Sequence, residues 1–409
     1  MTKFTKHSSL LHRSKNIPNK SKPIVEPISH AAAYSYDDEY ALSNIYQNKD
    51  KGFTYARTGS PTTSQVEAKI NLLEQGIGCV GFTTGMAAYD NMFFTLFNHK
   101  THIIASKFLF ANTISLLKSY SNKFGIEVTY VDVTNINEVK QAKKINTQII
   151  LVETIANPCT QIPALFEIGE FAKENNLVYI VDNTITSPAS FIPKLVGASL
   201  VVHSLTKSIS GHSRSLGGAV IDTGLFDWSK FSNIEEIYRP FKEQAYIMQL
   251  RKKGLRDKGA TLTAMQADLI AIGLETLYMR VEKANNNADM IAQYLDAHTN
   301  IENVMHPSLA NHKQHKQAKK YFNGNGYLIS FEVKNIYPFD FIKKLELIIS
   351  CSSIGDNRSL IIHPNSTIFA EISTEQKLEM GITDNTFRLS VGIEDVQDLI
   401  NDLDQALKI

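Results

Sequence analysis

Two stretches decide the fold of this chain: LVYIVDNT at 177–184 and SLVVHSLTK at 199–207. Each begins as a short run of β-branched and aliphatic residues and ends in polar ones. Apolar runs without alternation indicate strands that are buried on both faces of a sheet. Asp182 and Lys207 therefore stand at or just beyond the carboxyl ends of two buried strands, where open α/β sheets bind their ligands.

The same pattern recurs on both sides of these stretches. Five further apolar runs occur: CVGFT (79–83), HIIAS (102–106), IEVTYV (126–131), QIILVE (148–153) and GGAVID (217–222). Helical segments such as 86–97 and 163–175 lie between them, and 61–75 reads as a helix with Pro61 in its first turn and Gly76 as its cap. The sequence predicts an α/β fold with a mainly parallel, seven-stranded sheet between helices.

The second half of the chain has a different pattern. A long helical region at 256–296 precedes three strand-like runs at 327–333, 359–364 and 387–393. We expect a smaller C-terminal α+β domain. The predicted organisation of the 409 residues is an N-terminal arm (1–58), a large α/β domain (59–255) and the C-terminal domain (256–409).

Composition excludes several classes of protein. Lys and Arg (42) nearly balance Asp and Glu (41), so no overall field favours nucleic acid or an anionic membrane. No apolar run approaches the roughly 18 residues of a membrane span. The three cysteines are far apart, which favours a reducing compartment and a cytoplasmic location over a disulfide framework. The histidines at 306–317 lack Cys or carboxylate partners at ligand spacing, so we expect no metal site.

The N-terminus is unusually basic. Residues 1–22 carry six Lys or Arg and no acid. No apolar segment of roughly 7–15 residues follows, so a secretory signal is not expected. A targeting or nucleic-acid role stays open, but a solvated arm that packs on a partner subunit fits better.

Four features carry chemistry: VDNT with Asp182, HSLTK with Lys207, the strand-to-helix turn TTGMAA (83–88) and the glycine-rich GHSRSLGG (211–218). Taken singly, these would be caps, turns or solvated charges. Together they supply a lysine for a Schiff base, a carboxylate for a pyridine nitrogen and a helix N-terminus for a phosphate. Those are the needs of pyridoxal 5′-phosphate (PLP).

The sequence of these motifs resembles that of the PLP-dependent Cys/Met metabolism (trans-sulfuration) family, and the resemblance extends from about residue 24 to the C-terminus. It resembles most closely the O-acetylhomoserine sulfhydrylase and methionine γ-lyase-like members. The likeness is carried by YARTGSPT (55–62), TTGMAA, ETIANP (153–158), VDNT, HSLTK, GGAVIDTGLFDW (217–228), GLETLYMR (273–280) and RLSVGIE (388–394). It implies the fold-type I architecture of PLP-dependent transferases.

The resemblance also implies roles for individual residues. Lys207 would form the Schiff base and act as acid and base, and Asp182 would pair with the pyridine nitrogen. The phosphate would be held by Gly85, Met86, Ser204 and Thr206, with Asn157 near the ring hydroxyl and Phe110 on the ring face. Tyr55 and Arg57 match residues that reach the neighbouring subunit's phosphate, so the site would be shared in a homo-oligomer, at least a dimer and by analogy a tetramer. Arg388, with Ser353 beside it, would bind the substrate α-carboxylate.

Phe110 departs from the family pattern, which usually has tyrosine on the ring face. Phenylalanine cannot donate a proton, and general acid help is worth about 10²- to 10⁴-fold. A thiolate leaving group needs that help more than a carboxylate with a pKa of about 4. Phe110 therefore favours an O-acylhomoserine over methionine, unless Tyr55 or Lys207 supplies the proton. Asn112, where γ-lyases tend to carry cysteine, also weakens a methionine γ-lyase assignment.

We expect γ-replacement on an O-acylhomoserine, best O-acetylhomoserine, by sulfide or a small thiol, giving homocysteine or a relative. The alternatives are methionine γ-lyase or cystathionine γ-synthase or lyase activity. More remote is a non-catalytic PLP-binding paralogue with a regulatory role, against which Lys207, Asp182 and Arg388 together argue.

Overall fold

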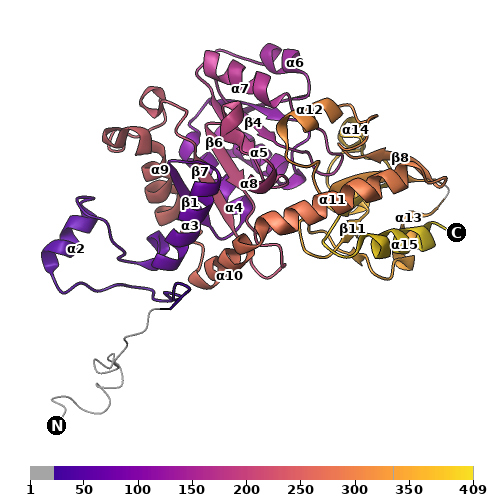
Figure 1. Cartoon of the computed structure of the whole chain (residues 1–409). Coiled ribbons are helices and arrows are strands. Elements are labelled where there is room, and N and C mark those ends of the chain that lie inside the picture. The colour runs from indigo at the N-terminus through magenta and orange to yellow at the C-terminus, as the bar shows by residue number, and fades with distance from the viewer. Residues whose placement is uncertain (1–22, 335, 409) are drawn as a thin grey trace, which may run out of the picture.

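The computed structural model describes residues 23–334 and 336–408. The chain forms a large domain around a mixed seven-stranded sheet and a smaller C-terminal domain around a five-stranded sheet, as expected (Figure 1). The basic stretch at residues 1–22 lies outside the described residues. Within the described residues, no helix combines the length and apolar character needed to cross a membrane.

The strands of the large sheet coincide with the seven apolar runs. They are β1 (Gly78–Phe82), β2 (His102–Ser106), β3 (Glu127–Val131), β4 (Thr147–Glu153), β5 (Val178–Asp182), β6 (Leu200–His203) and β7 (Gly218–Asp222). Their order across the sheet is β1-β7-β6-β5-β4-β2-β3. All neighbouring pairs are parallel except those of β7, which runs antiparallel to both β1 and β6. The carboxyl ends of β4, β5 and β6 therefore meet at one edge.

Burial on both faces explains the unbroken apolar runs. In β4, Ile149 and Leu151 belong to the core on one face, whereas Ile150 and Val152 belong to the core on the other. All four side chains are fully buried. A strand covered on both sides needs apolar residues at every position, and this requirement is what the sequence displays.

Helices cover both faces of the large sheet. They are α3 (Pro61–Leu73), α4 (Gly85–Leu96), α5 (Ala111–Phe124), α6 (Ile136–Gln141), α7 (Leu165–Glu174), α8 (Ser187–Ser190) and α9 (Ala245–Gln249). Shorter helical turns complete the domain: η1 (Ala56–Thr58), η2 (Pro193–Val196), η3 (Trp228–Lys230), η4 (Arg239–Gln244) and the π-helix η5 (Leu250–Arg256).

The cap of α3 differs from the prediction. Pro61 begins the helix as expected, after a Ser60–Thr63 capping box. The left-handed position is taken by Gln75 (φ 55°) and not by Gly76. Gly76 is needed for space instead, because a Cβ there would lie 2.9 Å from the backbone oxygen of Asp222.

The C-terminal domain is built on the helical region 256–296, which is two helices. These are α10 (Ala264–Glu275) and α11 (Leu277–Asp296); α11 contacts α8 of the large domain and β8, β9 and α15 of the small one. The remaining elements are β8 (Ile301–Met305), α12 (His315–Tyr321), β9 (Leu328–Val333), α13 (Pro338–Lys344), β10 (Ile349–Ser350), β11 (Leu360–Ile362), η6 (Pro364–Ser366), α14 (Thr374–Glu379), β12 (Thr386–Ser390) and α15 (Val396–Leu407). The sheet order is β10-β11-β12-β9-β8.

The described part of the N-terminal arm lies away from both sheets and carries the short helix α2 (Glu39–Tyr46) (Figure 1). A bridge between Ala33 and Tyr55 closes it into a loop. Tyr40 and Tyr46 are exposed on this arm. The limits at 58/59 and 255/256 stay predictions.

Candidate active site

A cavity of about 250 Å³ opens at the carboxyl ends of β4, β5 and β6. It is lined by residues from both domains: Thr84, Gly85, Met86, Tyr89, Phe110, Thr113, Glu153, Ile155, Asn157, Asp182, Thr184, Ile185, Ser204, Thr206, Lys207, Leu216, Ser352, Ile354 and Arg388. Nine of the residues that the sequence singled out are among them. The sheet topology thus brings together segments that are far apart in the sequence.

Lys207 reaches this cavity from the turn that follows β6. Its Nζ lies 3.4 Å from Ser353 Oγ of the C-terminal domain, a long and weak hydrogen bond. Burial, helped by the charge of Arg388, lowers the pKa of the Lys207 amine from 10.5 to about 8. A lysine of this kind is a nucleophile and a proton acceptor near neutral pH.

Asp182 ends β5, and its carboxylate already accepts two hydrogen bonds. Tyr89 of α4 donates its hydroxyl to Oδ2 at 2.7 Å. The backbone N–H of Thr184 donates to Oδ1 at 2.8 Å. An ionised carboxylate has about four lone-pair sites, so Asp182 can accept a further N–H from a ligand in the cavity.

Glu153 is a second carboxyl group in the cavity, paired with Asp182 across β4 and β5. Its Oε1 accepts the backbone N–H of Phe110 at 2.7 Å. Burial first, and the charge of Asp182 second, raise the pKa of Glu153 well above its usual value. The Glu153 carboxyl is therefore easier to protonate than an ordinary glutamate, and it also anchors Phe110 at the start of α5.

The N-terminus of α4 forms an anion-binding end of the cavity. Thr84 caps the helix by accepting the N–H of Ala87 at 3.0 Å. The N–H groups of the first helical turn have no partners within the helix, so those of Gly85 and Met86 are available to a phosphate. A Cβ on Gly85 would lie 2.9 Å from the Cβ of Ser204, which shows how closely the helix approaches the turn that follows β6.

The hydroxyl of Thr206 is partly engaged. It accepts the N–H of Gly217 at 3.0 Å and donates to the Gly217 carbonyl oxygen at 3.3 Å. The second bond is long for an O–H···O contact. Thr206 can therefore redirect its proton to an anion without loss of the shorter bond. Its expected role in binding the phosphate stays a prediction.

Arg388, on β12, is a buried cation with spare hydrogen-bonding capacity. Its side chain is 1% exposed, and its Nη2 donates to the carbonyl oxygen of Ser353 at 2.8 Å. None of the ion pairs in the described part of the chain includes it, and its Nε is buried there without a hydrogen-bond partner. Burial lowers the pKa of Arg388 from its ordinary value to about 10. A carboxylate ligand would supply the missing charge and acceptor.

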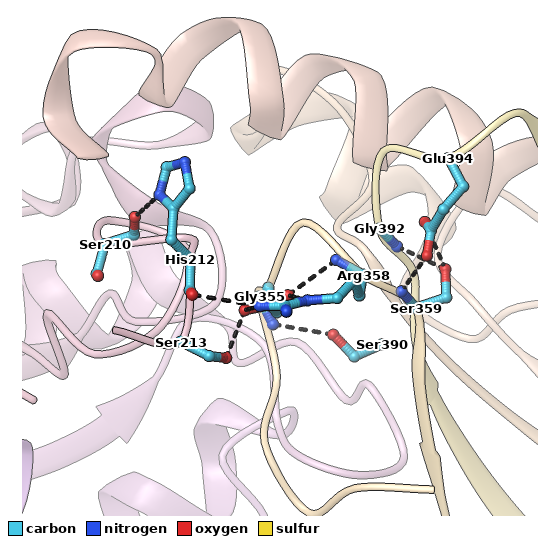
Figure 2. Close-up of polar contacts among 10 residues, drawn as sticks. Ser210, His212, Ser213, Gly355, Arg358, Ser359, Ser390, Gly392 and Glu394 are labelled. Atoms are coloured by element: carbon cyan, nitrogen blue, oxygen red, sulfur yellow. Dashed lines mark hydrogen bonds and ion pairs between the residues drawn. The ribbon is translucent and has the colours of Figure 1, made fainter. Parts of the chain in front are cut away.

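A polar cluster ties the loop after Lys207 to the C-terminal domain (Figure 2). Arg358 donates to the carbonyl oxygen of His212 at 3.2 Å and pairs with Asp356 at 2.6 Å. Ser213 also donates to Asp356. These bonds fix the segment that carries Ser353 against the segment that carries Lys207.

Tyr55 and Arg57 do not line the cavity of their own chain. Tyr55 is 48% exposed, and Arg57 donates to the carbonyl oxygen of Arg256 at 2.5 Å. Their expected role at a neighbouring subunit's site is compatible with this position and stays a prediction.

Comparison with known proteins places the chain in a family. Residues 7–408 match the model of the Cys/Met metabolism PLP-dependent enzymes. The chain belongs to this family of PLP-dependent enzymes. It is 36% identical to an L-methionine gamma-lyase of Fusobacterium nucleatum subsp. polymorphum, with 93% of each chain covered. It is 33% identical to an O-acetyl-L-homoserine sulfhydrylase of Leptospira meyeri, covering 93% of this chain and 92% of the relative.

A solved structure supports the same conclusion about fold and cofactor. The putative O-acetylhomoserine (thiol)-lyase of Campylobacter jejuni superposes with a TM-score of 0.90 at 30% identity. The match covers 99% of this chain and 100% of the neighbour, whose crystal structure contains N′-pyridoxyl-lysine-5′-monophosphate. The predicted family, fold class and cofactor are confirmed.

The cavity of this PLP-dependent enzyme fits its cofactor at three points. The first turn of α4 offers N–H groups to the phosphate, Asp182 has lone pairs left for the ring nitrogen, and Lys207 is a depressed-pKa amine. Each group is already held in place by protein contacts. The individual roles of the site residues stay predictions.

Sequence reasoning gave no role to ten of the lining residues, and two of these, Glu153 and Tyr89, have titratable side chains. Glu153 stands at the end of β4 as Asp182 stands at the end of β5, so the strand-end pattern could have found it. Tyr89 lies four residues after Gly85 on α4, on the same face of the helix. Asn112 is not in this cavity but lines a neighbouring hollow of about 640 Å³. Among the described residues, no group of His, Cys, Asp or Glu side chains is placed to hold a metal.

Proposed function

We propose that this enzyme catalyses γ-replacement on an O-acylhomoserine, with O-acetylhomoserine as the preferred substrate. Sulfide or a small thiol is the second substrate, and homocysteine or a related sulfur amino acid is the product. The observation that carries this choice is the phenyl ring of Phe110 in the cavity wall, in place of a phenol.

The chain's own residues have distinct tasks in this proposal. Arg388 binds the α-carboxylate with its unpaired Nε, and Ser353 lies beside it. Lys207, with a pKa of about 8, takes the proton from Cα of the substrate and returns protons in the later steps. The Asp182 carboxylate would accept a hydrogen bond from the protonated ring nitrogen. When bound, PLP supplies the electron sink for charge that develops at Cα.

The phosphate of the cofactor is assigned to one end of the cavity. Gly85 and Met86 provide backbone N–H groups, and Ser204 and Thr206 provide hydroxyls. Asn157 is placed near the ring hydroxyl. Its amide oxygen lies 3.4 Å from Arg388 Nη1, so it stands between the cofactor end and the carboxylate end.

Proton supply to the leaving group separates the candidate substrates. Among the described residues that line the cavity, Tyr89 is the one phenol, and its proton is given to Asp182. Burial raises the pKa of Tyr89 well above 10, which makes it a poor acid. A carboxylate leaving group, with a pKa of about 4, departs without a proton donor, whereas a thiolate is much more basic.

Elimination from methionine is the second candidate, because a relative at 36% identity is named L-methionine gamma-lyase. Its thiolate leaving group would then take its proton from Lys207 or from Tyr55 of a neighbouring subunit. Cystathionine is a further candidate substrate, because a relative at 34% identity is named cystathionine gamma-lyase. Asn112 does not line the Lys207 cavity and so adds nothing to the choice.

A substrate panel tests the proposal. Steady-state turnover is measured for O-acetylhomoserine, O-succinylhomoserine, cystathionine and methionine, each with and without sulfide. We expect homocysteine from O-acetylhomoserine with sulfide to dominate. Faster release of ammonia and 2-oxobutanoate from methionine without a thiol would overturn the proposal in favour of γ-elimination.

Phe110→Tyr tests the leaving-group explanation. A phenol at this position should raise kcat/KM for methionine relative to O-acetylhomoserine by about tenfold or more, since general acids contribute about 10²- to 10⁴-fold. The matched control is Phe124→Tyr, an exposed position at the other end of α5. If the ratio is the same in both variants, the ring at 110 does not set the substrate.

The proposal extends to assembly and location. We infer a homo-oligomer of at least two subunits, with a dimer of dimers as the expected form, in which Tyr55 and Arg57 complete the partner's phosphate site. The exposed arm supports this arrangement, since Ile24 and Val25 have no cover in a single chain. A cytoplasmic location fits the three free cysteines.

A further inference from the structure

The phenol of Tyr89 is buried at the back of the active-site cavity without an assigned task. Tyr89 lies on α4, one helical turn beyond the phosphate-binding amides, and is 3% exposed. Its hydroxyl donates to Asp182 Oδ2 at 2.7 Å. Its ring packs on Phe93 at 5.5 Å between centroids. The side chain is therefore held at both ends, and its one proton points at one carboxylate.

The carboxyl groups of Asp182 and Glu153 are close enough for the ionisation of one to oppose that of the other. They are neighbours across two parallel strands, and Glu153 is only 9% exposed. Two carboxylates so placed resist being ionised together. Tyr89 donates to Asp182, and the backbone of Thr184 donates to its other oxygen. Hydrogen bonds to a charged carboxylate favour its ionised form. Glu153 accepts the backbone N–H of Phe110 in the same way. The hydroxyl of Tyr89 is therefore the side-chain donor that favours the charge on Asp182 over the charge on Glu153.

The charge on Asp182 matters because a neighbouring anion favours the protonated form of a ring nitrogen. If Asp182 took the proton itself, the pair would become neutral and the ring would draw fewer electrons from Cα. The other titratable groups around Asp182 are Glu153, Lys207, Arg388 and Tyr327, and none of these donates a hydrogen bond to Asp182 in the described structure.

We propose that Tyr89 is a positioning residue that keeps Asp182 ionised and thereby keeps the ring nitrogen of bound PLP protonated. This inference rests on the placement of Asp182 at the ring nitrogen in the proposed function. It does not depend on which amino acid is the substrate. Tyr89 acts through Asp182 and takes no part in proton transfer to the substrate.

The test is the protonation state of the ring nitrogen, read directly by NMR. Holoenzyme is prepared with PLP labelled with ¹⁵N in the ring, and the nitrogen shift is followed against pH. In Tyr89→Phe, we expect the pH at which the nitrogen loses its proton to fall by about one unit or more, a loss of tenfold or greater in proton affinity. An unchanged titration in this variant would overturn the inference.

Tyr120→Phe is the matched control. Tyr120 is also a buried tyrosine, and its hydroxyl donates to Asp90 Oδ1 at 2.8 Å, but it lies outside the cavity. This variant loses the same kind of hydrogen bond and should leave the nitrogen titration unchanged. An equal fall in both variants would mean a general loss of packing and would also contradict the inference.

Two more variants separate the possible failures. Asp182→Asn should remove the ring proton outright; if it does not, Asp182 is misplaced and the proposed function fails with the inference. If Asp182→Asn removes the ring proton but Tyr89→Phe titrates like the native enzyme, the inference about Tyr89 fails and the proposed function stands. Site-specific replacement Tyr89→3-fluorotyrosine keeps the shape of the side chain and makes its hydroxyl a stronger donor. The pH at which the ring nitrogen loses its proton should therefore rise. A fall or no change in that pH would contradict the proposal even if Tyr89→Phe does not fold.

Discussion

The low pKa of Lys207 makes a quantitative prediction about how the protein captures its cofactor. Burial and the nearby Arg388 lower this pKa from 10.5 to about 8. At pH 7 the neutral amine is then about 9% of the total, against roughly 0.03% for a lysine at 10.5, an advantage of about 300-fold. Because only the neutral amine attacks an aldehyde, cofactor capture should be fast near neutral pH.

The perturbation is pH, and the assay is reconstitution of cofactor-free protein. The second-order rate constant for the appearance of the visible absorbance band is measured with added PLP from about pH 7 to about pH 10. The rate should rise and level off with a midpoint near 8. A rate that still climbs in proportion to hydroxide at the upper limit would show an ordinary, solvated lysine and refute the reasoning.

Arg388→Gln resolves the two causes of the low pKa. Glutamine removes the charge and keeps donors for the Ser353 carbonyl oxygen. Because burial is the larger cause, the midpoint should move upward but stay well below 10.5. Lys207→Ala should give no band at all, which excludes other lysines as the source of the signal.

Three further predictions concern stability and assembly. Burial raises the pKa of Asp222 to about 7, so its contribution to folding stability, at most about 4 kcal/mol, is present below its unfolded pKa near 4 and is lost as pH rises through about 7. The melting temperature of Asp222→Asn should therefore depend less on pH than that of the native protein. The fluorescence of Trp228, which donates to Asp222, should change with a midpoint near 7 in the native protein only. Gly76→Ala should lower the free energy of unfolding by about 1–3 kcal/mol, measured by urea denaturation, because the added Cβ meets backbone; a neutral result would show that the turn can move. Arg57→Ala and Lys207→Ala should each be nearly inactive alone, yet after mixing and subunit exchange should regain about a quarter of native activity, since half of the dimers then hold one intact site; no recovery would contradict a shared site.

Most of the large domain was predictable because its strands, apart from the edge strand β3, are buried on both faces. The seven apolar runs match β1 to β7 to within one or two residues. Two strands of the small domain could not be predicted from the sequence. β8 (IENVM) has two exposed positions and β10 consists of two exposed residues, so neither gives an apolar run. A strand of that kind is defined by its neighbours in the sheet, which the sequence does not display.

The position of candidate site residues was predictable where a polar residue stands at or just after the end of a buried strand. Asp182 and Lys207 follow such strands and do meet in one cavity. Tyr89 was not found because it lies in mid-helix, where an aromatic residue usually signals packing, and only the fold reveals the carboxylate opposite its hydroxyl. Tyr55 and Arg57 lie outside the cavity of their own chain, and their expected role at a neighbouring subunit's site stays a prediction.

The central claim is that the amine of Lys207 is the covalent anchor for PLP. Holoenzyme is reduced with borohydride, digested, and its lysine-containing peptides are weighed by mass spectrometry. The account predicts a phosphopyridoxyl group on Lys207 in nearly every chain. Recovery of that mass on a different lysine, with Lys207 unmodified, would contradict it.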